Sequence, residues 1–208
     1  MRLPLIMTGL SVAFAFKTGL FNIGAAGQYT LGAYGALYCA IMLKMPWYIC
    51  LIVATILGGI WGAIPGFFKA YFNINEVITS IMFNWIGLYL VNELIYQNGT
   101  GPMYDVRNTR TLNLGKSAEL SQSLIPDFGL NKMFQTNSTT IAIFLAAAVA
   151  VLIWVILNKT TFGYELKAVG LNKSAARYAG INEKKNIILS MAIAGALAGF
   201  GAGLYYPV

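Results

Sequence analysis

The chain has 208 residues, of which 58% are apolar and only 10% are charged, with a net charge of +7. Soluble domains average about 25% charged residues, so this composition excludes an ordinary soluble domain and indicates an integral membrane protein. The basic residues stand at the ends of apolar runs instead of forming one stripe, which argues against nucleic-acid binding. The chain has no His, and Cys39 and Cys50 lie in or beside apolar runs, so we expect neither a metal site nor a disulfide scaffold.

Apolar runs alternate with short polar connections along the whole chain. About 20 residues are needed to cross the hydrocarbon core of a bilayer, and most of the runs approach that length. The pattern predicts an all-α membrane helix bundle of about six segments, forming one domain over residues 1–208. The expected segments are residues 3–16 (a short run), 20–43, 47–68, 77–95, 140–157 and 187–206.

Two of these runs carry glycine at every fourth position. Such ridges let helix backbones approach closely in a membrane, where no hydrophobic effect drives helices together. We therefore expect helix-packing faces at Gly58, Gly62, Gly66, Gly195, Gly199 and Gly203.

Residues 17–28 combine three glycines with several polar side chains next to an apolar run. Irregular backbone is tolerated at membrane depth only where protein or a water-lined cavity satisfies it, so the stretch predicts a broken or re-entrant helix. Broken helices often form the substrate sites of transporters, which makes Asn22 and Gln28 candidates for a substrate pathway. An ordinary cytoplasmic turn leading into a helix is the alternative.

A second polar patch opens the fourth run. Glu76 and Thr79 lie three residues apart, and Asn84 follows deeper in the run, so these three are further candidates for the pathway. The alternative is structural: Asn75 caps the helix and Glu76 complements its positive end.

The loop at residues 158–186 is rich in Lys and Arg, which marks the cytoplasmic face of a membrane protein. Successive connections between membrane segments alternate between the two sides of the membrane, so we expect Lys17 and Lys69 inside. The Lys44 turn, the polar loop at about 97–138 and both chain ends are then expected outside. Within the basic loop, Asn172 or Ser174 is expected to cap a short helix. Three alanines, Ala175, Ala176 and Ala179, are expected to share one small apolar face, and Gly180 to end the helix. Such a helix can dock into another protein; the alternative is a solvated connector.

The sequence of residues 174–180, SAARYAG, resembles the coupling loop of ABC importer permeases, although Ser174 replaces the usual Glu and the Ile-x-Leu-Pro that often follows is absent. Together with FNIGAAGQ at 21–28 and the motifs at 66–86 and 160–181, it resembles nucleoside-type permeases of the branched-chain amino acid and simple-sugar group. Ala26 stands where that family usually carries Glu. The family has about ten membrane segments, so the resemblance predicts that this chain is a piece truncated at both ends.

The resemblance implies a permease subunit of a bacterial cell-membrane importer that hydrolyses nothing itself and needs no cofactor. It implies as partners two ABC ATPase subunits, a second related permease, an extracellular substrate-binding lipoprotein and the lipid bilayer. The ATPase-coupling residues would be Ser174, Ala175, Ala176, Arg177 and Gly180. Simple sugars or branched-chain amino acids are alternative substrates. A channel or a non-transporting scaffold is the alternative from another class, although the runs show no repeated filter-like motif.

Overall fold

The computed structural model describes residues 3–96, 103–105, 110–111 and 142–205. The regular elements among these residues are helices and one antiparallel pair of strands, β1 (Tyr104–Asp105) and β2 (Arg110–Thr111). The helices are α1 (Leu3–Lys17), α2 (Ala25–Ile41), α3 (Trp47–Phe72), α4 (Glu76–Tyr96), α6 (Ala142–Lys159), α7 (Thr161–Leu171), α8 (Lys173–Tyr178) and α9 (Glu183–Tyr205).

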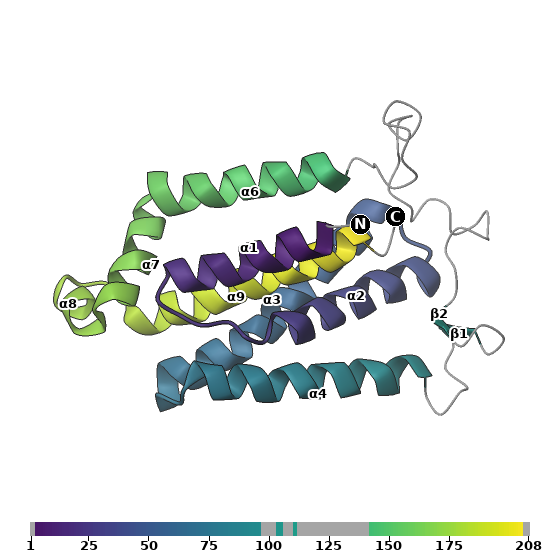
Figure 1. Cartoon of the computed structure of the whole chain (residues 1–208), viewed down its shortest axis with the longest axis horizontal. Coiled ribbons are helices and arrows are strands. Elements are labelled where there is room, and N and C mark those ends of the chain that lie inside the picture. The colour runs from purple at the N-terminus through teal and green to yellow at the C-terminus, as the bar shows by residue number, and fades with distance from the viewer. Residues whose placement is uncertain (1–2, 97–102, 106–109, 112–141, 206–208) are drawn as a thin grey trace.

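The long helices α3 and α9 form the centre of the bundle. Figure 1 shows α1 and α2 lying along them, with α4 on one side and α6 on the other. The C-terminal helix α9 is the most enclosed of the candidate spans, because α1, α2 and α3 all pack against it. Short helices α7 and α8 lie together at one end of the bundle (Figure 1).

The glycine ridges face each other across the contact between α3 and α9. A Cβ built on Gly195 would lie 2.3 Å from the Gly58 carbonyl oxygen, and one built on Gly62 would lie 2.6 Å from the Met191 carbonyl oxygen. Gly199, Gly66 and Gly203 make similarly close contacts along the same pair of helices. The backbones therefore touch directly at Gly58, Gly62, Gly195 and Gly199, and a side chain at any of these four would force the two helices apart. Gly66 and Gly203 pack most closely against side-chain atoms of the opposing helix.

Four helices of the described chain are long and apolar enough to cross a membrane: α3, α4, α6 and α9. Helix α1 is apolar but has only 15 residues, and α2 has 17. The prediction of a helical membrane bundle is thus confirmed, whereas these lengths do not establish six spans. The predicted loop at 97–138 lies outside the described residues except for 103–105 and 110–111.

The chain is not helical between α1 and α2, at residues 18–24. Gly19 takes the left-handed backbone conformation there, with φ +73°, and packs against Gly170 of α7. Helix α2 then begins beside the first turns of α4, since Gly24 lies against the Ser80 carbonyl. Residues 18–24 thus form a non-helical connection at the α7 end of the bundle, and a broken or re-entrant membrane helix at residues 17–28 stays a prediction.

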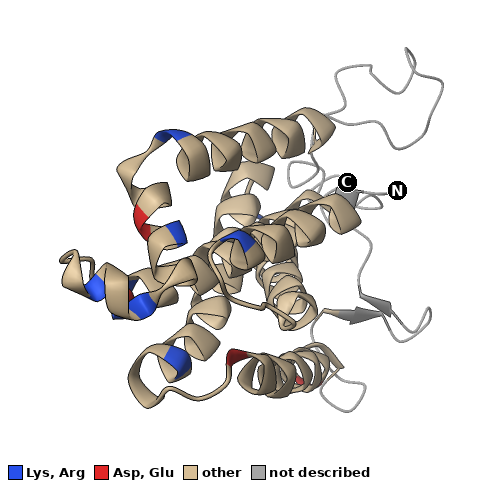
Figure 2. Ribbon diagram, turned by 60° about the vertical axis from the view of Figure 1, so that its left-hand side comes forward, with Lys and Arg blue, Asp and Glu red and all other residues tan. Residues whose placement is uncertain are grey.

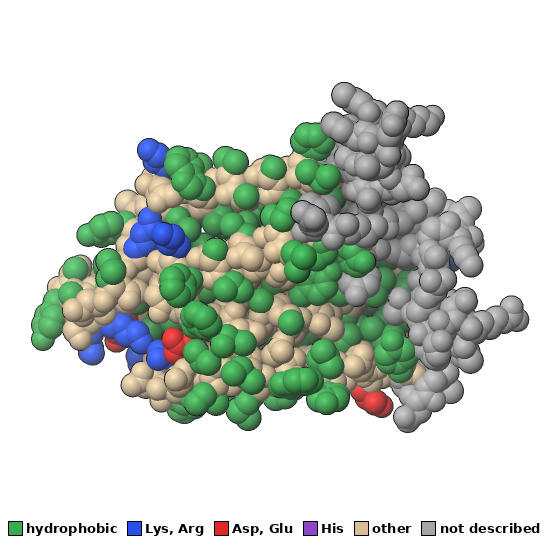
Figure 3. Space-filling view, in the orientation of Figure 1, with side chains coloured by type: hydrophobic (Ala, Val, Ile, Leu, Met, Phe, Trp, Pro, Cys, Tyr) green, Lys and Arg blue, Asp and Glu red, His purple; other side chains and the backbone are tan. Residues whose placement is uncertain are grey.

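Most of the Lys and Arg positions on the ribbon gather towards one end of the bundle, the end that carries α7 and α8 in Figure 1 (Figures 1 and 2). The flanks of the helices are instead covered by apolar side chains, as the face in Figure 3 shows. Exposed apolar side chains such as Ile60, Trp85 and Trp154 match a surface in contact with lipid. The residues at the basic end are Lys17, Lys69, Lys159, Lys167, Lys173, Arg177, Lys184 and Lys185.

Replacing Gly195 with Ala is expected to destabilise the bundle by roughly 1–3 kcal/mol, because the new methyl group would overlap the Gly58 backbone. Thermal unfolding of the purified protein in detergent measures the effect. Gly59→Ala is the matched control, since its Cβ would meet nothing closer than 3.4 Å. Equal melting temperatures for the two variants would contradict the close contact of α3 with α9.

Candidate functional site

The break between α1 and α2 is held by a pair of amide side chains. Asn22 Nδ2 donates to Gln28 Oε1 over 2.8 Å, and Gln28 Nε2 donates back to Asn22 Oδ1 over 3.1 Å. Asn22 Oδ1 also accepts from the Gly24 backbone N–H at 3.2 Å. Both amides are only 1% exposed, so each supplies the hydrogen bonds that the other needs in an apolar surrounding.

Hydroxyl groups fasten the same region to α9. Ser11 Oγ donates to the Ala194 carbonyl oxygen at 2.5 Å, and Thr18 Oγ1 is hydrogen-bonded to Ser190 Oγ. All of these side chains are buried. Ser11, Thr18 and Ser190 were not predicted as site residues, because single hydroxyl residues are common in membrane helices. Only their burial distinguishes them, and burial can be seen only once the fold is known.

Asn84 joins the beginning of α2 to α4. Its Oδ1 accepts from the Gly27 backbone N–H at 2.5 Å, and a Cβ on Gly27 would lie 2.8 Å from the Asn84 Cα. Unlike Asn22 and Gln28, Asn84 is only half-buried. One turn earlier on the same face of α4, the fully buried Ser80 Oγ has no hydrogen-bond partner among the described residues.

The first turn of α4 agrees with the structural alternative for this patch. Asn75 Oδ1 accepts from the Val77 N–H at 2.9 Å, and the Glu76 carboxylate pairs with Lys69 Nζ at 2.8 Å. Thr79 Oγ1 donates to the backbone carbonyl oxygens of Asn75 and Glu76, each at 3.2 Å. Glu76 and Thr79 therefore have local hydrogen-bond or ion-pair partners in the first turn of α4 and at the end of α3.

The short helix of the basic loop forms as a capped turn. Asn172 Oδ1 accepts from the Ala175 N–H at 3.1 Å, so Asn172, and not Ser174, is the cap. Gly180 follows in the left-handed conformation, with φ +79°. At the start of the preceding helix, Thr160 caps α7 by accepting from the Gly163 N–H at 3.1 Å. Each cap is the single residue between two helices: Thr160 separates α6 from α7, and Asn172 separates α7 from α8.

The expected shared face of three alanines on α8 is wrong. Ala176 is only 4% exposed and packs into a cluster of the chain's own apolar residues, while Ala175 and Ala179 are exposed on other sides of the helix. Ser174, Arg177 and Gly180 are exposed as well. The reason is geometric: positions 175 and 176 are about 100° apart on a helix, so a helix lying against the bundle buries only one of them. The cluster around Ala176 contains Leu20, Val169, Ile187 and Met191.

Two large apolar side chains near α8 point away from the bundle. Tyr178 is 93% exposed and Leu171 is 88% exposed. Neither was singled out from the sequence, because apolar residues in a loop give no signal of their direction. Tyr178 belongs to α8 itself, whereas Leu171 is the last residue of α7.

The loop is tied firmly to the membrane-crossing helices. The Asn186 Nδ2 of α9 donates to Glu165 Oε2 of α7 at 3.2 Å, and Gly170 packs on the Thr18 carbonyl. A cavity of about 760 Å³ lies between α8 and the ends of α3 and α9, and Lys69, Lys173, Arg177 and Lys184 are among its lining residues. Burial, and then the charge of Lys69, lowers the pKa of Lys173.

Among the described residues, no group of three or more His, Cys, Asp or Glu side chains is placed to hold a metal ion. The site described above consists of buried hydrogen-bonding side chains at the break, a basic end and exposed apolar side chains. These groups are suited to binding another molecule.

Curated relatives cover almost the whole chain. It is 41% identical over 207 residues to the guanosine ABC transporter permease protein NupP of Bacillus subtilis, and 36% identical over 211 residues to the nucleoside ABC transporter permease protein NupB of Lactococcus lactis. It is 32% identical to the glucose ABC transporter permease protein TsgB13 of Haloferax volcanii, over 95% of this chain and 53% of that protein. The first two alignments cover 97% of this chain and 56% of each relative, so the chain spans about half the length of these relatives. No solved structure matches.

A family model described as "Branched-chain amino acid transport system / permease component" matches residues 1–208, the full length of the chain. The recognition made from residues 21–28, 66–86 and 160–181 is therefore confirmed at the level of the family. The chain belongs to the permease components of the branched-chain amino acid transport system family, which are multi-pass plasma-membrane proteins and not enzymes.

Proposed function

We propose that this chain forms part of the membrane pathway of an ATP-driven importer of nucleosides. The observation that carries the proposal is the 41% and 36% identity, over nearly the whole chain, to permeases named for guanosine and nucleoside transport. A simple sugar is the second candidate substrate, favoured by the 32% identity to a glucose permease. Nucleosides rank first because the similarity to the nucleoside permeases is greater.

The pathway is proposed to run beside the contact between α2 and α4. Asn84 and Ser80 face this contact, and the half-buried Asn84 amide retains its Nδ2 donors for a passing nucleoside while its Oδ1 holds Gly27. Asn22 and Gln28 act in this proposal as supports, since their amides hydrogen-bond each other. Glu76 and Thr79 would line the basic end of the route, where Glu76 is paired with Lys69.

ATPase subunits are proposed to dock on α8, with Ser174, Ala175, Arg177, Tyr178 and the Gly180 turn in the contact. Ala176 would transmit the movement, because it is the residue of α8 that is buried against Leu20 and α9. Gly170 and Gly19 provide a second link, since their backbones touch. A displacement of the basic loop would thereby reach residues 18–24 and the amide pair without passing through a flexible connection.

The wider assembly follows from the family. We propose that residues 158–186 lie in the cytoplasm and that the loop at about 97–138 lies outside the cell, with six membrane segments in this chain. A second related permease would cover part of the exposed apolar flanks, and an extracellular lipoprotein would deliver the substrate. The gathering of cations at the α7 and α8 end supports this orientation.

Transport of labelled solutes by vesicles that contain the complete importer tests the proposed substrate. Labelled guanosine should accumulate only with ATP, and unlabelled nucleosides should compete while glucose and branched-chain amino acids should not. Preferential accumulation of glucose would move the assignment to the sugar alternative.

Asn84→Asp serves as the matched variant in the same assay. It keeps an oxygen for the Gly27 N–H but removes the Nδ2 donor, so the complex should still assemble. Uptake should fall at least about twofold to twelvefold, because one hydrogen bond worth about 0.5–1.5 kcal/mol is lost and the new carboxylate adds a charge to the half-buried site. Normal uptake with normal assembly would take Asn84 out of the proposed pathway.

Ala175→Glu tests the docking surface without disturbing the bundle, because Ala175 is exposed in this chain. Burying its new carboxylate under an ATPase subunit should reduce ATPase co-purification and nucleoside-stimulated ATP hydrolysis severalfold. Thr161→Glu is the control, an equal charge change at an exposed position of α7. Ala176→Glu is unsuitable, since it would break the chain's own core. If Ala175→Glu and Thr161→Glu both behave like the unmodified protein, α8 is a connector and not a docking site.

A further inference from the structure

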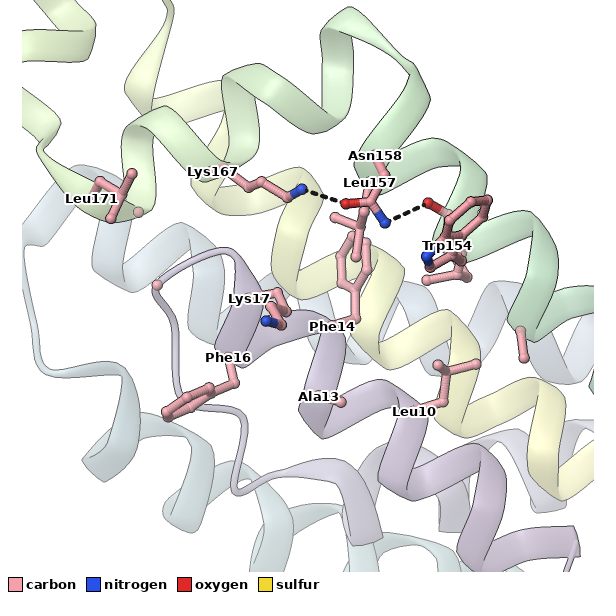
Figure 4. Close-up of a pocket in the computed structure, with 14 residues that line it drawn as sticks. Leu10, Ala13, Phe14, Phe16, Lys17, Trp154, Leu157, Asn158, Lys167 and Leu171 are labelled. Atoms are coloured by element: carbon pink, nitrogen blue, oxygen red, sulfur yellow. Dashed lines mark hydrogen bonds between the residues drawn. The ribbon is translucent and has the colours of Figure 1, made fainter.

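A separate cavity lies on the flank of the bundle, between α1, α6 and α7. It measures about 620 Å³, and Gly19 of the break between α1 and α2 is one of its lining residues. Its walls are apolar over most of their length, with Leu10 and Phe14 from α1 facing Ile153, Trp154 and Leu157 from α6 (Figure 4). The cavity lies beside α6, a candidate membrane span, so its apolar walls stand at the depth of the lipid tails.

The basic end of this cavity carries two lysines. Lys17, the last residue of α1, and Lys167 of α7 both line it. Figure 4 shows Lys17 beside Phe14, and Lys167 above it between Leu171 and Asn158. Lys167 Nζ donates to Asn158 Oδ1 at 2.8 Å, and Asn158 Nδ2 donates to the Trp154 carbonyl oxygen at 3.0 Å. Asn158 thus holds Lys167 over the cavity. Neither lysine forms an ion pair with a carboxylate among the described residues.

We propose that this cavity binds one anionic phospholipid, with an acyl chain along the α1 and α6 walls and the phosphate between Lys17 and Lys167. Basic pockets between membrane helices on the cytoplasmic side are suited to anionic headgroups, and each nearby Lys contributes about 1 kcal/mol. The apolar walls exclude a free anion as the natural occupant, because a phosphate alone would leave them exposed to water. Charge complementarity at one end and apolarity along the rest point to one amphipathic molecule.

The site has a structural consequence. It joins α1 and α6 to α7, the helix whose Gly170 also touches Gly19 at the break. A bound lipid would therefore brace α7 against α1 and α6. This inference concerns lipid binding and does not depend on which solute is transported.

Native mass spectrometry of the full-length protein tests the site. The protein is titrated with phosphatidylglycerol and, separately, with phosphatidylcholine of the same acyl chains. One phosphatidylglycerol should bind preferentially, and Lys17→Gln with Lys167→Gln should weaken its binding roughly fivefold per lysine removed. Ala13→Trp, which places a large side chain in the cavity, should weaken the binding of both lipids.

Lys185→Gln is the matched control, because Lys185 is an exposed cation at the same end of the bundle but outside the cavity. It should leave the preference unchanged, and the double substitution to Arg at positions 17 and 167 should retain it. Equal binding of the two lipids, an equal loss in the Lys185→Gln variant, or binding of inorganic phosphate as tight as that of the lipid would overturn the proposal. Absence of any bound lipid would overturn it too, because the cavity would then be filled by another segment of the protein.

Discussion

Direct contact between the backbones of α3 and α9 is the constraint on which the rest of the bundle depends. In a membrane the tails of lipids are as apolar as leucine, so only close packing and hydrogen bonds bring helices together. Gly58, Gly62 and Gly195 meet the opposing helix with room for a hydrogen but not for a methyl group. This central pair offers a fixed surface against which α1 and α2 pack, and against which an interrupted segment can be held.

The interruption at residues 18–24 brings polar backbone into an apolar bundle, and its hydrogen bonds must therefore be met from within. Asn22 and Gln28 satisfy each other, Thr18 reaches Ser190, and Asn84 accepts from Gly27. These bonds connect α1, α2, α4 and α9 at one level of the structure. Because Gly19 also touches Gly170, the same joint lies against the basic loop. The fold thus places the candidate pathway and the candidate docking helix in mechanical contact.

Period and composition were sufficient to predict the helical membrane bundle. The structure also has close backbone contacts at glycines of α3 and α9, a non-helical stretch at residues 18–24 and a capped turn followed by Gly180. The side of a helix on which each side chain is buried was harder to predict. A run of small residues does not say which alanine meets the bundle, so Ala176 was placed on the outer face although it is buried against Ile187 and Met191. Likewise, the exposure of Tyr178 and the burial of Ser11 depend on contacts between segments far apart in the sequence. Helix length was also misjudged, since residues 20–24 were counted in a span but lie in the break.

The central claim is that the end bearing α8 faces the cytoplasm, where ATP-driven subunits can reach it. Labelling of single cysteines by a membrane-impermeant thiol reagent in intact cells tests it most directly. The experiment uses Tyr178→Cys and Lys132→Cys in a background in which the buried Cys39 and Cys50 are replaced by Ala. The account predicts that position 132 reacts in intact cells and that position 178 reacts only after the membrane is permeabilised. Reaction of position 178 from outside would contradict the orientation, the docking surface and the proposed coupling together.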